Sequence, residues 1–352
     1  MIVVIPTNRS VDLAALAPLI DSGARFIVVD DSEGSITVDH PSFEVYTWAD
    51  RRARLGELDV AVPKRNGACR DFGFYLAWHE SDDGEIVVAL DDDCVVYHHD
   101  FATRVERALS ARSRPVVRTT GRHLNILELY RDVPPALYPR GFPYSARTSD
   151  TGVAIGPDDA RDVKFSLGLW KGAFDVNAID KVNGPVWQHP DAELEQESVI
   201  VEAGHLVSVC SMNMHLRREV IPALYQLPMH VEVMPNWVID RYGDIWGGFI
   251  LKTLMDKRGD AMAVGEPMIR HVKAGDHQRN IWQEHVCHLV NDEFIDLVLA
   301  ASEPIATASY LDMMDELNEN ICGLRTSCSP LLGTFVEHLT DALAAWTTAL
   351  RK

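Results

Sequence analysis

The sequence predicts an α/β protein with a doubly wound, mostly parallel sheet and a helical extension at its C-terminal end. Apolar runs at 2–5 and 26–29 flank a stretch of helical periodicity. A strand, a helix and a second strand in such close succession are typical of parallel pairing. From about residue 281 the apolar spacing becomes helical throughout. We therefore expect two parts, a sheet domain at 1–282 and a helical extension at 283–352.

A strand followed by three acids is the most informative stretch of the chain. The apolar residues 86–90 end in Asp91, Asp92 and Asp93. Open α/β sheets bind ligands at the carboxyl ends of their strands, where these acids would lie. Because adjacent carboxylates repel one another, we expect a divalent cation among them, and oxygen ligands favour Mn²⁺ or Mg²⁺. A diphosphate is the usual second partner of such an ion. The alternative is an acidic turn in which one Asp caps the next helix.

Composition and charge limit the classes of partner. Of 352 residues, 47% are hydrophobic and 24% charged, as in ordinary globular proteins. The formal charge of -19 repels nucleic acid and anionic membranes, so we expect neither as a partner. We find no signal-peptide pattern and no apolar run long enough to span a membrane, and expect a cytoplasmic protein. The six cysteines form no CxxC pair, which predicts neither a zinc site nor a disulfide framework.

Polar residues follow the first two strands. Thr7 lies in the loop after the first strand, and Asp30 and Asp31 close the second. Acids at this position suit the ribose or base of a nucleoside. An exposed acidic turn is an equally good interpretation of Asp30 and Asp31.

A basic loop precedes the next helix. Lys64, Arg65 and Arg70 lead into a helical pattern through Phe72 and Leu76. The free backbone N–H groups and the dipole at a helix N-terminus add to the side-chain charge. We therefore expect an anion to bind at this loop.

A proline-rich stretch lies between about 113 and 165, and we expect no long regular elements there. A loop this long in a compact domain is usually functional or disordered. Arg140 and Arg147 flank an aromatic and proline core and are suited to grip phosphate or sugar hydroxyls. Two solvated surface arginines are the alternative.

Five residues further along are candidates for the same pocket. Trp170 and Asn213 lie in later strand-like runs, and Trp170 taken alone is better explained by a place in the core than by stacking on a ligand. Asp244 opens a helical pattern, where a carboxylate is either a cap or a catalytic group. His271 and Lys273 end a strand-like run two residues apart, and would lie on one face if that run is extended.

Several of these stretches together resemble one family, the reversibly glycosylated polypeptides, known in plants as UDP-arabinopyranose mutases and grouped with glycosyltransferase family 75. The resemblance covers roughly residues 2–283 in order and spacing, which makes it more specific than a single acidic triplet. The stretches that carry it are Val4–Thr7, Gly67–Gly73, Asp91–Cys94, Arg140–Arg147, Gly168–Trp170, Cys210–Asn213, Arg241–Trp246 and His271–Ala274.

The resemblance implies a GT-A-like fold, a UDP-sugar ligand and a divalent metal, commonly Mn²⁺. In that picture the acidic triplet holds the metal and the ribose. Asp91, Asp93 and His271 would be the metal ligands, and Asp92 would face the nucleotide. The further candidates for binding the nucleotide sugar are Thr7, Asp30, Asp31, Arg65, Trp170 and Asn213.

The resemblance also implies roles for basic residues. Arg70 and Lys273 would face the diphosphate. In the plant family the arginine that matches Arg140 becomes glycosylated, and the one that matches Arg147 is also required. Both are present here with the family's seven-residue separation. Metal and arginine would stabilise the charge on the departing UDP.

This sequence departs from the family at several positions. Plant members carry two acids before a Met/Ile-Trp pair, where this chain has Gly243 and then Asp244. Leu167 replaces a family histidine, and Arg65–Asn66 replaces an acidic pair. The tail beyond residue 283 resembles nothing that we can place. The donor class is therefore better defined than the reaction.

We expect a UDP-sugar pyranose/furanose mutase that converts UDP-arabinopyranose or a similar UDP-pyranose. Two other functions stay open. A glycosyltransferase would use the same donor site to modify a small acceptor, with room provided by Gly243 and the altered tail. A non-catalytic UDP-sugar-binding subunit would act by association, although the intact acids argue against it. The helical extension would pack on the sheet domain or on another subunit, and we expect a homo-oligomer.

Overall fold

The computed structural model describes residues 1–134, 136–148, 152–182, 184–272 and 275–352. Its strands are β1 (Ile2–Thr7), β2 (Arg25–Asp30), β3 (Phe43–Tyr46), β4 (Ile86–Leu90), β5 (Cys94–Val95), β6 (Arg114–Thr119), β7 (His123–Leu124), β8 (Val153–Asp159), β9 (Val163–Ala173), β10 (Gln188–His189), β11 (Ser198–Val201), β12 (Leu206–Val207), β13 (Asn213–Arg217), β14 (Val231–Met234), β15 (Trp237–Ile239) and β16 (Ala261–His271). Its α-helices are α1 (Ala17–Asp21), α2 (Trp48–Leu55), α3 (Asp71–Glu80), α4 (Phe101–Ala108), α5 (Ala178–Lys181), α6 (Gly243–Arg258), α7 (His277–Ser302), α8 (Tyr310–Leu324) and α9 (Pro330–Arg351).

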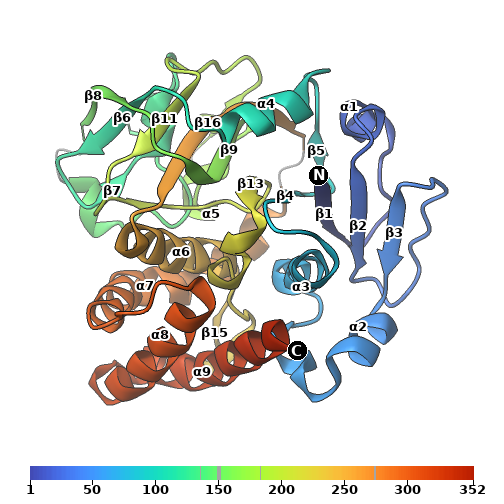
Figure 1. Ribbon diagram of the computed structural model, residues 1–352. Coiled ribbons are helices and arrows are strands. Elements are labelled where there is room, and N and C mark those ends of the chain that lie inside the picture. The colour runs from blue at the N-terminus through green and yellow to red at the C-terminus, as the bar shows by residue number, and fades with distance from the viewer. Residues whose placement is uncertain (135, 149–151, 183, 273–274) are drawn as a thin grey trace.

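A mixed sheet of 12 strands forms the centre of the molecule (Figure 1). Its main path runs β3-β2-β1-β4-β13-β9-β16-β11-β6-β8. The first four strands on this path are parallel, so their carboxyl ends meet at one edge. β13 then runs antiparallel to both β4 and β9, and both kinds of pairing occur beyond it. The predicted α/β class with a C-terminal helical extension is confirmed.

Close packing of α3 holds the parallel strands. Gly73 faces β1 and β2, and a Cβ at this position would overlap the side chain of Val4. Only glycine lets the helix approach the sheet so closely. The loop that carries Arg70 ends at the start of this helix, so the packing fixes its position at the strand ends.

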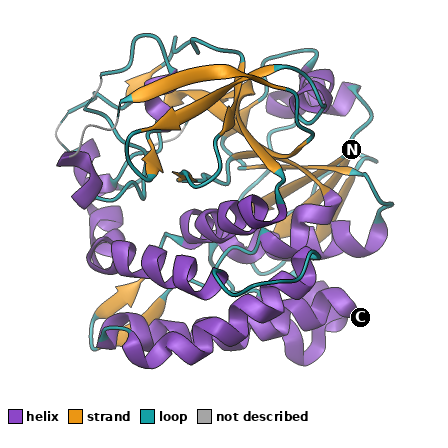
Figure 2. Cartoon of the chain, turned by 60° about the vertical axis from the view of Figure 1, so that its left-hand side comes forward, coloured by secondary structure: helices purple, strands orange, loops and turns teal. Residues whose placement is uncertain are grey.

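The C-terminal helices pack on the sheet domain of the same chain, which is one of the two arrangements expected. Figure 1 shows the end of α9 beside α3, and Figure 2 shows the helices gathered in a layer beneath the sheet. Trp78 of α3 donates its Nε1 hydrogen to the carbonyl of Leu350 at 2.8 Å, and Trp346 donates to the carbonyl of Pro222 at 3.0 Å. One hydrophobic core runs through both parts.

The boundary expected between residues 282 and 283 falls inside α7, which begins at His277. The prediction that residues 1–282 and 283–352 form two separate domains is not tested by this observation. In the described ranges no helix is long and apolar enough to cross a membrane.

Two parts of the chain differ in detail from the sequence expectations. The proline-rich stretch is more regular than expected, because it contains the short strands β6 and β8. β8 is an edge strand, where a proline such as Pro157 is tolerated. The strand-like run expected around Asn213, at residues 207–214, is not one strand. β12 ends at Val207, a turn follows, and β13 begins at Asn213.

Candidate active site

A cleft of about 1150 Å³ opens at the carboxyl ends of β1, β2 and β4. The loops after these strands and the basic loop before α3 form one end, and the starts of α6 and α7 contribute to the other. Most of the predicted site residues meet here, although they come from distant parts of the chain. The predicted residues that line the cleft are Thr7, Asp31, Arg65, Arg70, Asp91, Asp92, Asp93, Arg140 and Asp244.

Arginine side chains pair with the acidic triplet and reduce the repulsion between its carboxylates. Asp92 accepts hydrogen bonds from Thr7 Oγ1 at 2.6 Å and from Arg9 Nε at 2.9 Å. Arg9 also lies 3.4 Å from Asp93. Arg9 thus supplies a positive charge from the loop after β1, and the expectation of a divalent cation among these acids stays a prediction.

Arg70 braces the triplet from behind. Its buried guanidinium donates to Asp91 and, through Nη1, to the carbonyl of Ser211 at 2.7 Å. Burial raises the pKa of Asp91 even though Arg70 opposes that shift. Arg70 thus ties the end of β4 to the loop before β13, and only part of its charge is available to an anion in the cleft.

His271 completes this end of the site from β16, although it does not itself line the cleft. Its Nδ1–H donates to the carbonyl of Ala173 at 2.6 Å, and its Nε2 lies 3.6 Å from Asp93 Oδ1. Burial alone would lower the pKa of His271, but the Asp93 carboxylate raises it overall. A hydrogen bond from Nδ1 to a carbonyl is the usual way to orient a metal-binding histidine through Nε2.

The donor chemistry fits a divalent cation only in part. Asp93 and His271 face each other and offer the oxygen and imidazole donors that Mn²⁺ accepts. Asp91 is bonded to Arg70. Among the described residues, no group of three or more His, Cys, Asp or Glu side chains converges closely enough to hold a metal. A bound ion would therefore use Asp93 and His271, and a diphosphate bound beside it would have to supply further ligands.

Asp31, Lys64 and Arg65 also line the cleft. Asp31 accepts hydrogen bonds from Trp48 Nε1 at 2.7 Å and from the backbone N of Asn66 at 3.0 Å. Lys64 Nζ lies 4.5 Å from the centre of the Trp48 ring. Arg65 is exposed and pairs with Glu33, which does not line the cleft. These groups place two cations and an acid at the mouth of the cleft.

Asp30 plays a different part from Asp31. It is fully buried and accepts hydrogen bonds from the backbone N of Ser32 at 2.7 Å and of Ile36 at 3.1 Å. Asp30 therefore does not lie in an exposed turn, and it does not line the cleft where a ligand would bind. Asp30 fixes the loop after β2 and so sets the position of Asp31.

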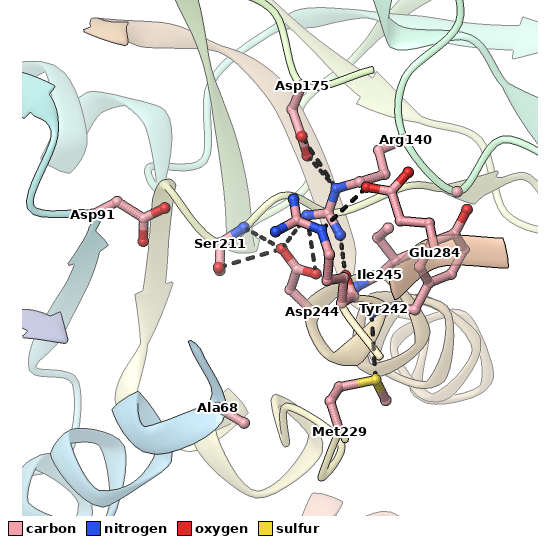
Figure 3. A network of polar contacts seen from close by, with 12 residues as sticks. Ala68, Asp91, Arg140, Asp175, Ser211, Met229, Tyr242, Asp244, Ile245 and Glu284 are labelled. Atoms are coloured by element: carbon pink, nitrogen blue, oxygen red, sulfur yellow. Dashed lines mark hydrogen bonds and ion pairs between the residues drawn. The ribbon is translucent and has the colours of Figure 1, made fainter. Parts of the chain in front are cut away.

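Arg140 is the centre of the other end (Figure 3). Its guanidinium lies between Asp175, 3.0 Å from Nε, and Asp244, 3.1 Å from Nη2, and its Nη1 donates to the carbonyl of Arg241. Only 7% of the residue is exposed, so the alternative of a solvated surface arginine is wrong for Arg140. Burial would lower its pKa, but Asp175 and Asp244 raise it well above the ordinary value.

The local sequence explains why Arg140 is held so firmly. Gly141 adopts a left-handed φ of 83°, and a Cβ there would overlap Ile245 of α6. Asp244 is the second residue of α6 and accepts hydrogen bonds from the backbone N of Ser211 at 3.2 Å as well as from Arg140. Asp244 is therefore more than a helix cap, since it joins α6 to two loops.

Glycine at 243 allows close packing. A Cβ on Gly243 would lie 2.6 Å from the carbonyl oxygen of Leu227, and Leu227 donates its N–H to the Gly243 carbonyl at 3.1 Å. Gly243 itself lines the cleft, so the expectation that this glycine makes room for an acceptor stays a prediction.

Five of the described residues that were predicted at the site do not line the cleft, namely Asp30, Arg147, Trp170, Asn213 and His271. Trp170 is fully buried, and the amide of Asn213 donates to the carbonyls of Leu169 at 3.1 Å and Pro267 at 2.8 Å. Both belong to the core behind the site. Arg147 pairs with Asp180 at 3.0 Å. Its guanidinium also lies 4.8 Å from the Tyr138 ring and 4.1 Å from the Tyr144 ring. Lys273 lies outside the described residues.

Sequence reasoning missed the acids and bases that hold these groups. Glu284 of α7 is 1% exposed and accepts hydrogen bonds from Arg241 Nε at 3.1 Å and from the backbone N of Ala178 at 2.8 Å. It thereby anchors Arg241, whose carbonyl faces Arg140, and makes the C-terminal helices part of the site. Arg9 and Asp175 were missed for the same reason, because each acts on a partner far away in sequence.

Comparisons with known proteins agree on one family. The family model described as "Reversibly glycosylated polypeptide" matches residues 1–352, so it also takes in the tail that the sequence motifs could not place. The chain is 26% identical to "Probable UDP-arabinopyranose mutase 4" of Arabidopsis thaliana over 357 residues, which cover 99% of this chain and 89% of that protein. It is 24% identical to "UDP-arabinopyranose mutase 1" of Oryza sativa subsp. japonica over 356 residues, which cover 99% and 89%.

Among solved structures, the chain is similar to glucosyl-3-phosphoglycerate synthase from Mycobacterium tuberculosis in complex with Mn²⁺, uridine-diphosphate and phosphoglyceric acid. The TM-score is 0.38 at 14% identity, with 84% of this chain and 78% of that chain covered.

Proposed function

The chain belongs to the reversibly glycosylated polypeptide family, and on that premise we propose that it is a metal-dependent UDP-sugar mutase. It would interconvert a UDP-pyranose, such as UDP-arabinopyranose, and the corresponding UDP-furanose. The relatives named UDP-arabinopyranose mutase support this reaction. The observation that carries the proposal is the Arg140 guanidinium, buried between Asp175 and Asp244 in the same cleft as the acidic triplet.

The two ends of the cleft suit the two halves of a UDP-sugar. Asp31 and Lys64 line the cleft and offer polar groups for the nucleoside, and Trp48 holds both of them from outside the cleft. The triplet with Arg9 and Arg70 lies next, where the diphosphate would sit. A divalent ion held by Asp93 and His271 would supply positive charge beside the leaving diphosphate. The sugar would then reach Arg140 and Asp244.

In the proposed reaction, the bond between the anomeric carbon and the phosphate oxygen of UDP breaks, and the oxygen keeps the electron pair. A nitrogen of Arg140 bonds to the anomeric carbon and loses one proton. Asp244 is the acceptor for that proton, because its carboxylate already lies 3.1 Å from Nη2. A proton must move because the two carboxylates hold the guanidinium in its charged form.

The remaining steps change the ring and restore the enzyme. The bond from the anomeric carbon to the ring oxygen breaks, the ring oxygen takes the proton from Asp244, and the anomeric carbon stays bonded to the Arg140 nitrogen as a cationic C=N group. Another hydroxyl of the sugar then bonds to the anomeric carbon, gives its proton to Asp244 and so closes the furanose ring. The same phosphate oxygen of UDP then bonds to the anomeric carbon, the bond to Arg140 breaks, and the proton returns from Asp244. No atom is gained or lost, so the reaction needs no co-reactant.

The size of the cleft favours one second candidate. At about 1150 Å³ it exceeds the range of roughly 300–1000 Å³ that is usual for small-molecule sites. Arg241, Arg279 and Gln283 also line the cleft. A glycosyltransferase that moves the sugar to a small acceptor would use this space. As parts of either proposal we keep a cytoplasmic location, a homo-oligomer, and no nucleic-acid or membrane partner.

The test is to incubate the purified chain with Mn²⁺ and UDP-arabinopyranose, without acceptor, and to follow the nucleotides by chromatography. We expect a second UDP-pentose peak that reaches a constant ratio with the first. An unchanged nucleotide pool across a panel of UDP-pyranoses would contradict the mutase. Release of UDP that becomes fast only when small acceptors are added would favour the transferase.

A further inference from the structure

Gln226 is a buried polar residue that the reaction described above does not use. It is 3% exposed and lines the cleft. Its side-chain Nε2 has no hydrogen-bond partner among the described residues. Buried amide groups in folded proteins almost always have a partner, so an unpartnered one beside a binding cleft points to a missing ligand or water.

Two neighbours of Gln226 share this property. The backbone N of Gln226 donates to Asp71 Oδ1 at 3.2 Å, while Oδ2 of the same carboxyl has no partner in the described part of the chain. Arg70, which precedes Asp71, has an unpartnered Nε. Asp71 is fully buried behind the cleft, and burial raises its pKa well above the usual range. Gln226 Nε2, Asp71 Oδ2 and Arg70 Nε thus form a connected set of polar atoms that have no hydrogen-bond partner in the described part of the chain.

Contacts from two directions link Gln226 to the end of the cleft that holds Arg140. On one side, Leu227 hydrogen-bonds the carbonyl of Gly243, the residue before Asp244. On the other side, Arg70 donates to the carbonyl of Ser211, whose N–H donates to Asp244. Gln226 therefore belongs with the groups that would meet the sugar. Asp31 and Lys64, which we assign to the nucleoside, lie in the loop after β2 and in the basic loop before α3.

We propose that Gln226 is a specificity-determining residue that hydrogen-bonds a hydroxyl group of a neutral sugar in the bound UDP-sugar. This inference rests on the proposed function, because it assumes that a nucleotide sugar occupies the cleft. A carboxamide both donates and accepts, which matches a hydroxyl and gives no preference for a charged substituent. A site built around such a group rejects a ligand that lacks the hydroxyl, since the buried amide then stays unpaired.

The test compares the affinities of UDP and UDP-arabinopyranose by calorimetry in Mn²⁺ buffer. Gln226→Met keeps the length of the side chain and removes its hydrogen bonds. We expect its affinity for UDP to stay within about twofold of the wild type, and its affinity for the UDP-sugar to fall at least about tenfold. Gln278→Met is the matched control, because Gln278 lies in the first turn of α7 and does not line the cleft.

Deoxy analogues of the UDP-sugar identify the hydroxyl. Removing the hydroxyl that Gln226 reads should weaken binding to the wild type and leave binding to Gln226→Met unchanged. Equal losses in both proteins for every analogue would overturn the proposal. So would unchanged UDP-sugar affinity in Gln226→Met, and in both cases the proposed function would still stand.

A structural role for Gln226 has its own signature. If Gln226→Met and the shorter Gln226→Asn both lose UDP and UDP-sugar binding to the same extent, Gln226 supports the fold and the proposal is overturned. Failure of the proposed function is distinguishable from these outcomes, because a wild-type chain that binds neither UDP nor UDP-sugar would contradict it before any variant is made.

Discussion

The two ends of the cleft hold their charges in opposite ways. At the acidic end, Arg9 pairs with Asp92 and Asp93, and its side chain is 37% exposed. At the other end, Arg140 is buried, and each nitrogen of its guanidinium is bonded to a carboxylate or a carbonyl. An exposed counter-ion can give way to a ligand, whereas a fully bonded one cannot move without breaking several bonds. We infer that the first end adapts to the diphosphate and the second is preorganised for the sugar.

The largest effect should come from breaking the preorganised end. We expect Arg140→Ala to lower turnover by about a thousandfold or more, since the proposed acceptor of the sugar is removed. UDP affinity should stay within about a factor of ten, because Arg140 is assigned to the sugar. Steady-state rates and UDP calorimetry measure the two effects. Arg131→Ala, at an exposed ion pair, is the control. A rate equal to that of the control would remove Arg140 from the reaction.

The next effect breaks the adaptable end. We expect Asp93→Ala to abolish the part of UDP affinity that depends on Mn²⁺, because Asp93 faces His271 and offers the oxygen donor there. UDP titrations with Mn²⁺ and with chelator measure this part. Asp100→Ala is a control at an exposed acid outside the cleft. Tight, Mn²⁺-dependent binding of UDP to Asp93→Ala would sink the metal assignment.

A smaller effect tests whether the C-terminal helices help to build the preorganised end. Glu284→Gln keeps an acceptor for the Ala178 N–H but loses the charge that pairs with Arg241. We expect kcat to fall about tenfold to a hundredfold with little change in KM, because Arg140 would lose its fixed position. Glu284→Asp should recover part of the rate. Equal losses in kcat and UDP affinity would instead indicate general disruption of the fold.

The smallest expected effect concerns Arg9, the exposed counter-ion at the acidic end of the cleft. Arg9 competes with a cation for Asp92 and Asp93, so Arg9→Ala should bind Mn²⁺ several-fold more tightly at low ionic strength. Arg9→Lys should lie between the two. Direct Mn²⁺ titration without nucleotide gives the affinities. Weaker Mn²⁺ binding in Arg9→Ala would mean that Arg9 orients the acids for the metal.

Much of the framework could be predicted from local patterns. The β4 strand and its acids, the helix that ends at Gly259, and the three helices of the extension each follow from periodicity and breakers within one stretch. The loop with Arg140 could be marked as functional for the same reason, since an arginine between prolines and aromatics is visible in the sequence.

The pairings inside the site could not be predicted in this way. Arg9 and Asp92 are 83 residues apart, and Arg140 and Asp244 are 104 apart. No periodic signal connects them, because a polar pair across the fold depends on how the elements pack. The same limit explains Asp30 and Asn213, whose polar side chains satisfy buried backbone groups rather than a ligand.

The most direct measurement is to locate the sugar on the enzyme during turnover. Incubation with UDP-arabinopyranose labelled in the sugar, followed by rapid denaturation, digestion and mass spectrometry, would find any covalent adduct. The account predicts label on the peptide that contains Arg140, and none when the same experiment uses Arg140→Ala. Turnover by the wild type with label on a different residue, or with no labelled peptide, would contradict it.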